Sequence, residues 1–501
     1  MNSIAIKAND SHSPAVSAGE KRRYFHAPNG WWGPILFMLS MSAVGLSFYP
    51  AWLIVLAMLL KRFRTDRYEA LIMILIILAG SGFRDQPTTI ECGLIYMVSI
   101  PLMFLMRKTP ATVRILKVWA VYSIGCLGFA YLSLESIISQ SMVLMWYLSF
   151  AFIMIPLGMF AGRSFSMDDF FNRLYPFAMI FMVFYWIDGL ILCGPVMLSR
   201  LQPFVGVMKF YELYIIPFGG LSGYIARVYP AGFYIPMMLV YPVVRRYRLR
   251  IWELVLFLGA LFITKTFALI SAMLLGYIIC QKGFGKVSKY IIVGTGLFLA
   301  IYGIDVAISD PADIVTAEGS KLRVASTVTQ FVVLDEAQDV EDLSEFGTGR
   351  MAQIIPKVER LYELGLEWTG FGFLHPSKTE NRMFMIENHL YSDIEQSEES
   401  VATVEVIPVQ VFLNMGYFGL VWHILYLIAL VLCVRKLPDA KYAWSLMALF
   451  IWIGISGFCG MMSAQGQIIV ATAFAMVILQ EKTRLGINCK ESPILINRKK
   501  R

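Results

Sequence analysis

Long apolar stretches alternate with short polar connectors along most of this chain. The apolar runs are about 15–25 residues long and recur from Trp31 to Gln480. Within lipid, only helices and closed barrels satisfy their own backbone polar groups, and barrel strands alternate between apolar and polar residues. These runs do not alternate. The pattern therefore predicts an all-α, polytopic integral membrane protein with about fourteen transmembrane helices.

Basic connectors predict which ends of these helices face the cytoplasm, because Lys and Arg are enriched in cytoplasmic loops. Residues 61–67, 107–114, 162–173 and 245–250 are basic, and the connectors between them are short and poor in charge. All the basic connectors fall on one side, which we assign to the cytoplasm. The uninterrupted spans are predicted at 68–83, 89–106, 114–132, 140–161, 174–193, 229–244, 290–306, 407–432, 442–460 and 465–480.

Two apolar stretches need a break to fit a membrane. Pro50 divides residues 31–60, which form either one kinked span or a tight hairpin, and the basic flanks favour the hairpin. The stretch 251–280 is too long for one crossing and carries Lys265 near its middle. Two short helices that meet at an external tip around 264–266 explain both features.

This topology divides the chain into successive parts, of which the large external loop is acidic and partly helical. The loop carries nineteen Asp or Glu residues against seven Lys or Arg. The first thirty residues are too poor in apolar residues for a signal peptide. The parts are a cytoplasmic tail at 1–30, transmembrane helices at 31–306 with a small external loop at about 194–228, the large external loop at 307–406, the last transmembrane helices at 407–480 and a cytoplasmic tail at 481–501.

Composition supports the membrane class and argues against several others. The 501 residues are 57% hydrophobic and 16% charged, with a mean hydropathy of +0.64, whereas a soluble protein has about 25% charged residues. The net charge of +8 comes from dispersed loop residues, so we expect membrane lipids and no nucleic acid as partners. The seven cysteines form no CxxC pair, and the acids at 335–345 lack metal-ligand spacing. No metal and no cofactor are therefore expected.

Polar residues that could take part in catalysis or binding gather between residues 347 and 420. If residues 387–393 (ENHLYSD) are helical, His389 shares a face with Asp393, and Glu387 shares one with Tyr391. A carboxylate that orients an imidazole is a usual arrangement for a general base, although a solvated surface histidine is the alternative. The candidates in this segment are Arg350, His375, Glu380, Arg382, Glu387, Asn388, His389 and Asp393. A further histidine, His423, lies in an apolar run and is expected to be a packed or interfacial residue there.

Several cations outside or at the start of this segment are candidates for binding a phosphate. The guanidinium of Arg350 suits a phosphate or diphosphate, but it could also pair with the many neighbouring acids. Arg227 and Arg200 lie near predicted span ends, where an arginine is either functional or reaches toward lipid headgroups. Lys265 must face a wet cavity or a partner, or else anchor the hairpin tip.

Four segments give the chain a likeness to a known family. The tetrapeptide GTGR (347–350) precedes the glycine turn GFG (370–372), and ENH (387–389) precedes a span that starts LNMGYFGLVWHIL (413–425). ITKTFALI (263–270) is a short polar tip within an apolar stretch, and RVYPAGFYIPMML (227–239) opens a span with an arginine. In order and spacing, the chain resembles the bacterial O-antigen polymerase and ligase family. It differs in reading Asn-His where the family reads His-Asn, and in having a lysine at the hairpin tip where an arginine is common.

The resemblance implies a metal-independent, inverting glycosyltransferase in the bacterial inner membrane, with its active site facing the periplasm. Its substrates would be undecaprenyl-diphosphate-linked oligosaccharides, and a chain-length regulator protein would be a partner. A polymerase that joins repeat units into O-antigen, capsular or exopolysaccharide is the favoured activity. The alternatives are a ligase that transfers glycan to lipid A–core and, less favoured because the chain shows no internal repeat, a transporter of lipid-linked sugars.

The resemblance also implies roles for the candidate residues. His389 and Glu387 are the candidate bases for the acceptor hydroxyl, and Arg350 is the candidate catalytic cation for the leaving diphosphate. The remaining predicted contacts with the diphosphate or the sugar are Arg227, Lys265, Arg200, Arg382, Glu380, Asn388, His375 and Tyr391.

Overall fold

The described part of the chain is mostly helical, in agreement with the predicted all-α class. The structure is a computed structural model that describes residues 23–45, 48–78, 110–132, 153–160, 163–187, 238, 241–242, 247–264, 284–311, 314, 324–325, 328, 350–373, 379–390, 407–435 and 475–481. Its elements are β1 (Arg23–Tyr24), α1 (Trp32–Gly45), α2 (Ala51–Thr65), α3 (Arg67–Leu78), α5 (Pro110–Leu132), α7 (Met167–Ile187), β2 (Tyr247–Arg248), α10 (Ile251–Thr264), α12 (Phe284–Ile308), α16 (Arg350–Glu363), α17 (Thr379–Glu387) and α19 (Ile407–Arg435).

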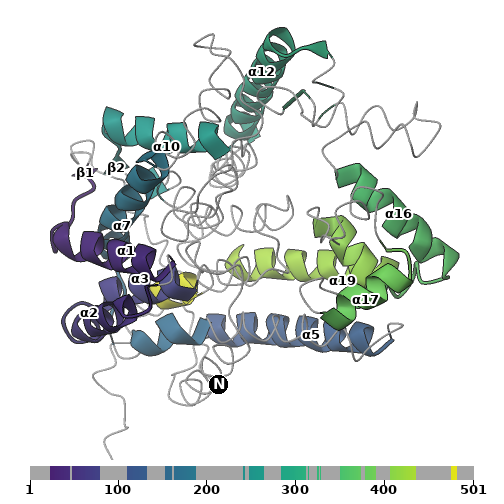
Figure 1. The fold of residues 1–501 in the computed structure, drawn as a ribbon, viewed down its shortest axis with the longest axis horizontal. Helices are drawn as coiled ribbons and strands as arrows, with labels where there is room; N and C mark the ends of the chain where they lie inside the picture. The colour runs from purple at the N-terminus through teal and green to yellow at the C-terminus, as the bar shows by residue number, and fades with distance from the viewer. Residues whose placement is uncertain are drawn as a thin grey trace, which may run out of the picture.

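The helices form two groups along the longest axis of the molecule (Figure 1). At one end, α1, α3 and α10 all contact α7, and α2 packs against α1 and α3. At the other end, α16 and α17 lie against the first part of α19, while α5 runs alongside α19. The two groups therefore place the start of α19 far from the N-terminal helices.

Several helices coincide with predicted spans, but the number of membrane crossings stays a prediction. The described parts α5, α12 and α19 overlap the spans predicted at 114–132, 290–306 and 407–432. Within the described ranges, one helical stretch, Pro408–Ala429, is long and apolar enough to cross a membrane. The predicted spans 89–106 and 442–460 lie outside the described residues.

The apolar stretch 31–60 forms a helical hairpin rather than one kinked helix. α1 and α2 pack side by side, and the start of α1 lies beside the end of α2, since a Cβ at Gly33 would approach the Arg62 guanidinium to 3.0 Å. Pro50 is the N-cap residue of α2. A proline is tolerated at a helix start because the missing N–H would have no intrahelical partner there. The proline therefore begins a new helix instead of bending the first.

α7 begins earlier than the span predicted at 174–193. Ser166 precedes the helix, and its Oγ accepts a hydrogen bond from the N–H of Asp169 at 3.3 Å. Asp168 and Asp169 occupy the first turn, where negative charge interacts favourably with the helix dipole. These polar residues form the first turns of α7, although their hydropathy places them in a connector.

α5 and α19 are antiparallel neighbours. The hydroxyl of Tyr122 lies 2.8 Å from Nδ1 of His423, and the Trp422 Nε1–H donates to the carbonyl of Tyr122 at 3.2 Å. The rings of Tyr122 and Tyr426 stack with centroids 3.8 Å apart. His423 is buried. Of the two expected environments, the packed one is therefore confirmed.

Residues 23–30, which the sequence assigns to a cytoplasmic tail, are folded onto the N-terminal helices. β1 pairs in parallel with β2, so that Arg23 lies opposite Tyr247. Phe25 is 1% exposed and stacks on Tyr247 and Tyr175, with ring centroids 4.7 and 5.6 Å apart. The local sequence does not predict this packing, because the rings that bury Phe25 come from distant parts of the chain.

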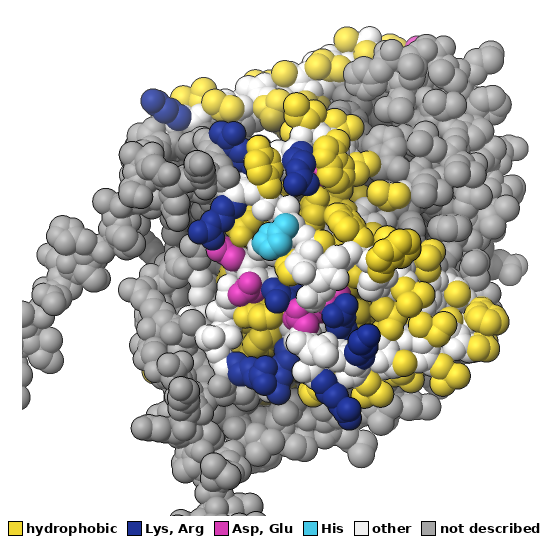
Figure 2. Space-filling model, turned by 90° about the vertical axis from the view of Figure 1, so that its left-hand side faces the viewer, with side chains coloured by type: hydrophobic (Ala, Val, Ile, Leu, Met, Phe, Trp, Pro, Cys, Tyr) yellow, Lys and Arg dark blue, Asp and Glu magenta, His cyan; other side chains and the backbone are white. Residues whose placement is uncertain are grey.

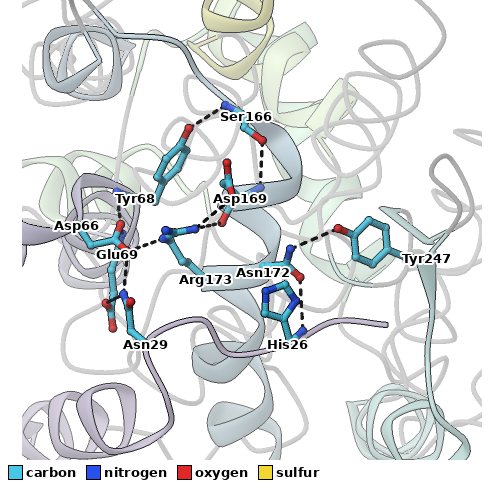
Figure 3. Close-up of polar contacts among 10 residues, drawn as sticks. All are labelled: His26, Asn29, Asp66, Tyr68, Glu69, Ser166, Asp169, Asn172, Arg173 and Tyr247. Atoms are coloured by element: carbon cyan, nitrogen blue, oxygen red, sulfur yellow. Dashed lines mark hydrogen bonds and ion pairs between the residues drawn. The ribbon is translucent and has the colours of Figure 1, made fainter. Parts of the chain in front are cut away.

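A polar cluster joins the connectors that were predicted to share the cytoplasmic side (Figure 3). The Asn29 amide donates to Asp66 and to Glu69, each at 2.7 Å, and Arg173 Nε donates to Asp66 at 2.5 Å. The His26 N–H donates to the side chain of Asn172 at 3.4 Å. Figure 2 shows Lys and Arg side chains gathered on this face of the molecule. Connectors that lie far apart in the sequence thus meet on one face.

The Asp66–Arg173 ion pair is expected to stabilise the fold. Burial raises the pKa of Asp66, but hydrogen bonds from Arg173 and Asn29 and the charge of Arg173 outweigh it, so the pKa lies below its usual value. We expect Asp66→Asn to lower the free energy of unfolding by about 2 kcal/mol at pH 7. Because the folded pKa is depressed, this contribution is present above the pKa of the unfolded state and is lost as the pH falls through the folded pKa.

Thermal unfolding of purified protein at several pH values measures this effect. Asp169→Asn is the matched control, because Asp169 also contacts Arg173, at 3.4 Å, but is 54% exposed and should contribute little. A double-mutant cycle between Asp66→Asn and Arg173→Met with no coupling energy would contradict the assignment.

Candidate functional site: a helical cap on α19

Residues 350–373 and 379–390 form a small helical unit that packs on the first part of α19; we call this unit the cap (Figure 1). The cap belongs to the predicted large external loop. On α16, apolar residues at helical spacing, including Ile354, Val358 and Leu361, face α17 and α19. The buried core of the cap consists of Ile354, Leu361, Phe371, Phe384, Met385, Leu390 and Leu413. The cap is thus fastened to α19 by a shared hydrophobic core.

α16 ends in a Schellman motif. The Leu366 N–H donates to the carbonyl of Leu361, and the Gly365 N–H donates to the carbonyl of Tyr362, each at 3.0 Å. Gly365 has a φ of 67°, the left-handed conformation that this motif requires. Glycine is the usual residue at this position because it has no Cβ to clash.

α17 ends in the same motif, but a histidine occupies the glycine position. The Leu390 N–H donates to the carbonyl of Met385 at 2.8 Å, and the His389 N–H donates to the carbonyl of Ile386 at 3.1 Å. His389 has a φ of 55°, the one positive φ among non-glycine residues in the described ranges, and its side chain is exposed. A left-handed backbone costs a residue with a Cβ about 1 kcal/mol. Such strained positions gather at functional sites.

Residues 388 and 389 do not continue α17. α17 ends at Glu387, and the left-handed backbone of His389 prevents the helix from continuing. The helical pairings of His389 with Asp393 and of Glu387 with Tyr391 depend on a continuous helix from residue 387, and this condition is not met at His389. Tyr391 and Asp393 themselves lie outside the described residues.

Among the described side chains, that of Arg360 contacts the segment that carries His389. Its Nε donates to the carbonyl of Asn388 at 3.1 Å, and its Nη1 donates to Glu363 at 2.7 Å. Asn388 also donates from its side chain to the carbonyl of Phe384 at 2.9 Å. Arg360 therefore holds the peptide that directly precedes His389. Nothing in its local sequence points to this role, because the contact arises from the packing of α16 against α17.

Arg350 lies at the opposite end of α16 from this contact. It is the first residue of the helix, ten positions before Arg360, which corresponds to about 15 Å along the helix axis. Its side chain lies outside the described part of the structure. The structure thus brings Arg360, and not the backbone of Arg350, to the Asn388–His389 segment.

The structure describes some of the other predicted site residues fully, some only by their backbone, and some not at all. Glu387, Asn388 and His389 are consecutive at the end of α17, with Glu387 and His389 exposed. Glu380 and Arg382 belong to α17, but their side chains lie outside the described residues. The positions of the remaining predicted residues also lie outside the description, so their approach to the cap stays a prediction: Arg200, Arg227, Lys265, His375 and Tyr391.

The loop of the cap runs along a break in α19. Gly416 has non-helical angles, with φ 63° and ψ −164°. Beside this break, the Phe371 N–H donates to the carbonyl of Leu413 at 2.7 Å, and the Tyr417 N–H donates to the carbonyl of Glu367 at 2.8 Å. The cap thereby satisfies backbone groups that the broken helix cannot pair internally.

Two glycines allow the backbones to approach this closely. A Cβ at Gly370 would lie 2.3 Å from backbone atoms of Asn414 and Met415, and a Cβ at Gly416 would lie 2.2 Å from the backbone of Trp368. Both glycines also have a positive φ. We call this contact the glycine interlock. It joins two motifs that the sequence showed separately, the GFG turn and the start of the span after the loop.

An exposed imidazole and a carboxylate lie at the end of a cap that is locked to a broken, membrane-type helix. Comparison of the chain with protein-family models, curated proteins and solved structures finds no match.

Proposed function

We propose that the protein is a membrane glycosyltransferase that polymerises undecaprenyl-diphosphate-linked oligosaccharide repeat units into O-antigen, capsular or exopolysaccharide. Its active site faces the periplasm, and its chain crosses the inner membrane about fourteen times. The observation that carries this proposal is the exposed His389, held in a strained conformation beside Glu387 on a cap that is fixed to α19.

The proposed reaction is an inverting transfer. The hydroxyl oxygen of the acceptor sugar attacks the anomeric carbon of the donor, and the bond from that carbon to the diphosphate oxygen breaks. The hydroxyl proton passes to His389 or Glu387, and the electron pair leaves with undecaprenyl diphosphate. An imidazole is well suited to accept a proton near neutral pH. Cations near the diphosphate stabilise the developing negative charge. Arg350 is the predicted cation, although its backbone lies about 15 Å along α16 from the Arg360–Asn388 contact.

The arrangement of the chain supports this orientation in the membrane. The elements that carry the polar cluster and those of the cap lie at opposite ends of the longest axis (Figure 1), and Lys and Arg side chains gather on the face at the polar-cluster end (Figure 2). An excess of Lys and Arg is typical of the cytoplasmic side. A break such as that at Gly416 is tolerated at membrane depth where protein covers it, and such breaks are common beside substrate sites.

Purified protein in nanodiscs, supplied with lipid-linked repeat units alone, is expected to yield a ladder of glycans without lipid A–core. A ladder or transfer that depends on lipid A–core would assign the ligase instead. Movement of repeat units across the bilayer without extension would assign the transporter. His389→Ala and Arg350→Ala are each expected to abolish long glycans while protein level and membrane insertion stay normal. Wild-type ladders from both variants would overturn the site assignment.

A further inference from the structure

Four exposed aromatic side chains gather where α16, the cap loop and the break in α19 meet. Their exposed fractions are 47% for Tyr362, 51% for Trp368, 40% for Tyr417 and 57% for Phe418. The Trp368 ring lies 5.5 Å from the Tyr417 ring and 5.1 Å from the Phe418 ring, between centroids. The hydroxyls of Tyr362 and Tyr417 are 2.5 Å apart. The rings therefore hold one another in place and form a preorganised platform.

A carboxylate with an unused oxygen belongs to the same platform. The backbone carbonyl of Glu367 accepts the Tyr417 N–H, so the residue is fixed beside the rings. Its Oε2 atom is buried and has no hydrogen-bond partner in the described structure. A second carboxylate, that of Glu363, is 61% exposed one turn earlier. The hydrogen bond with Tyr417 raises the pKa of Tyr362, and the charge of Glu367 adds to this, so Tyr362 keeps its proton.

We infer that this platform is a binding subsite for a pyranose unit of the glycan, an inference that rests on the proposed function. A pyranose ring presents C–H groups on its faces and hydroxyls around its rim. Exposed aromatic rings match the apolar faces, while a carboxylate accepts hydrogen bonds from the hydroxyls. Sites of this kind combine apolar walls with a few fixed polar groups. The carboxylate of Glu367, a partly exposed residue fixed beside the rings, supplies such a group.

A membrane surface is the alternative environment for these rings beside the break in α19, because Trp and Tyr are enriched at such surfaces. The exposed apolar face of α19 continues from Phe418 through Val421 and Leu425. Two features favour the sugar. The carboxylate of Glu367 would repel anionic headgroups, and it offers sugar hydroxyls a hydrogen-bond acceptor beside the rings.

Binding of the free glycan tests the subsite in full-length protein in nanodiscs. The probe is the reducing oligosaccharide that mild acid releases from the lipid-linked oligosaccharides of a strain lacking the protein. We expect Glu367→Gln and Trp368→Leu each to weaken its binding roughly tenfold. Binding of undecaprenyl diphosphate without sugar should not change. Trp32→Leu is the matched control, because Trp32 is 83% exposed but lies at the N-terminal helices.

Each contrary outcome has a distinct meaning. Unchanged oligosaccharide affinity in both platform variants, while the wild type still extends glycans, overturns the subsite and leaves the proposed function intact. Unchanged affinity together with weaker retention of Trp368→Leu in the bilayer assigns the platform to the membrane surface. A wild type that binds neither the oligosaccharide nor its lipid-linked form overturns the subsite and the proposed function together.

Discussion

Replacing His389 by glycine is expected to stabilise the protein while abolishing glycan extension. The backbone of His389 has a φ of 55° and occupies the glycine position of a Schellman motif. Glycine adopts this conformation without steric cost, so the free energy of unfolding should rise by about 1 kcal/mol. The same change removes the proposed base. Thermal unfolding and the glycan ladder, measured on the same preparation, should therefore move in opposite directions.

The first helix of the cap provides the reciprocal control. Gly365 occupies the same position at the end of α16, with a φ of 67° and no atom within 4 Å of a Cβ placed there. Gly365→His should lower stability by about 1 kcal/mol and leave the ladder in place. If His389→Gly keeps wild-type extension, the imidazole is not the base. If it destabilises the protein, the histidine side chain has a structural role instead.

Alanine at Gly370 or Gly416 is expected to destabilise the protein severely and to abolish extension. At each position the new Cβ would lie within 2.3 Å of backbone atoms, and φ is positive. Backbone atoms cannot yield as a flexible side chain does, so overpacking and left-handed strain add to about 3–5 kcal/mol. This is a large part of the 5–15 kcal/mol that typically separates folded from unfolded protein, as an order of magnitude. The cap would then separate from α19.

Alanine substitutions at two other glycines are the controls. They separate the effect of the close backbone approach from the effect of adding a Cβ to any glycine. Gly365→Ala keeps the positive φ but meets no atom within 4 Å, so it should cost only about 1 kcal/mol. Gly128→Ala, in α5 and equally unobstructed, should be neutral or slightly stabilising. Thermal unfolding and limited proteolysis of the cap measure these effects. Comparable losses of stability in Gly370→Ala, Gly416→Ala, Gly365→Ala and Gly128→Ala would show that the glycine interlock is no more sensitive to a Cβ than the other two positions.

The pattern of apolar residues predicted helix boundaries well where the length of an apolar run alone determines them. α19 begins at Ile407, the residue at which the sequence places the start of that span, and Pro50 separates α1 from α2. Prediction failed where polar residues enter a helix or an apolar residue is buried by distant partners. α7 begins at Met167 because Ser166 and the first-turn acids form a favourable start. Phe25 is buried by rings from α7 and β2.

The sequence by itself determined that the chain is largely helical, where its polar residues gather and which glycines and histidines are distinctive. These properties depend on residue type and on spacing within one segment. Only the tertiary structure decided that Arg360 contacts Asn388, that His389 ends α17 in a left-handed conformation, and that Gly370 meets the break in α19. These contacts arise when separate helices bury a common core, and no pattern within one helix specifies its partner or the register in which the two pack.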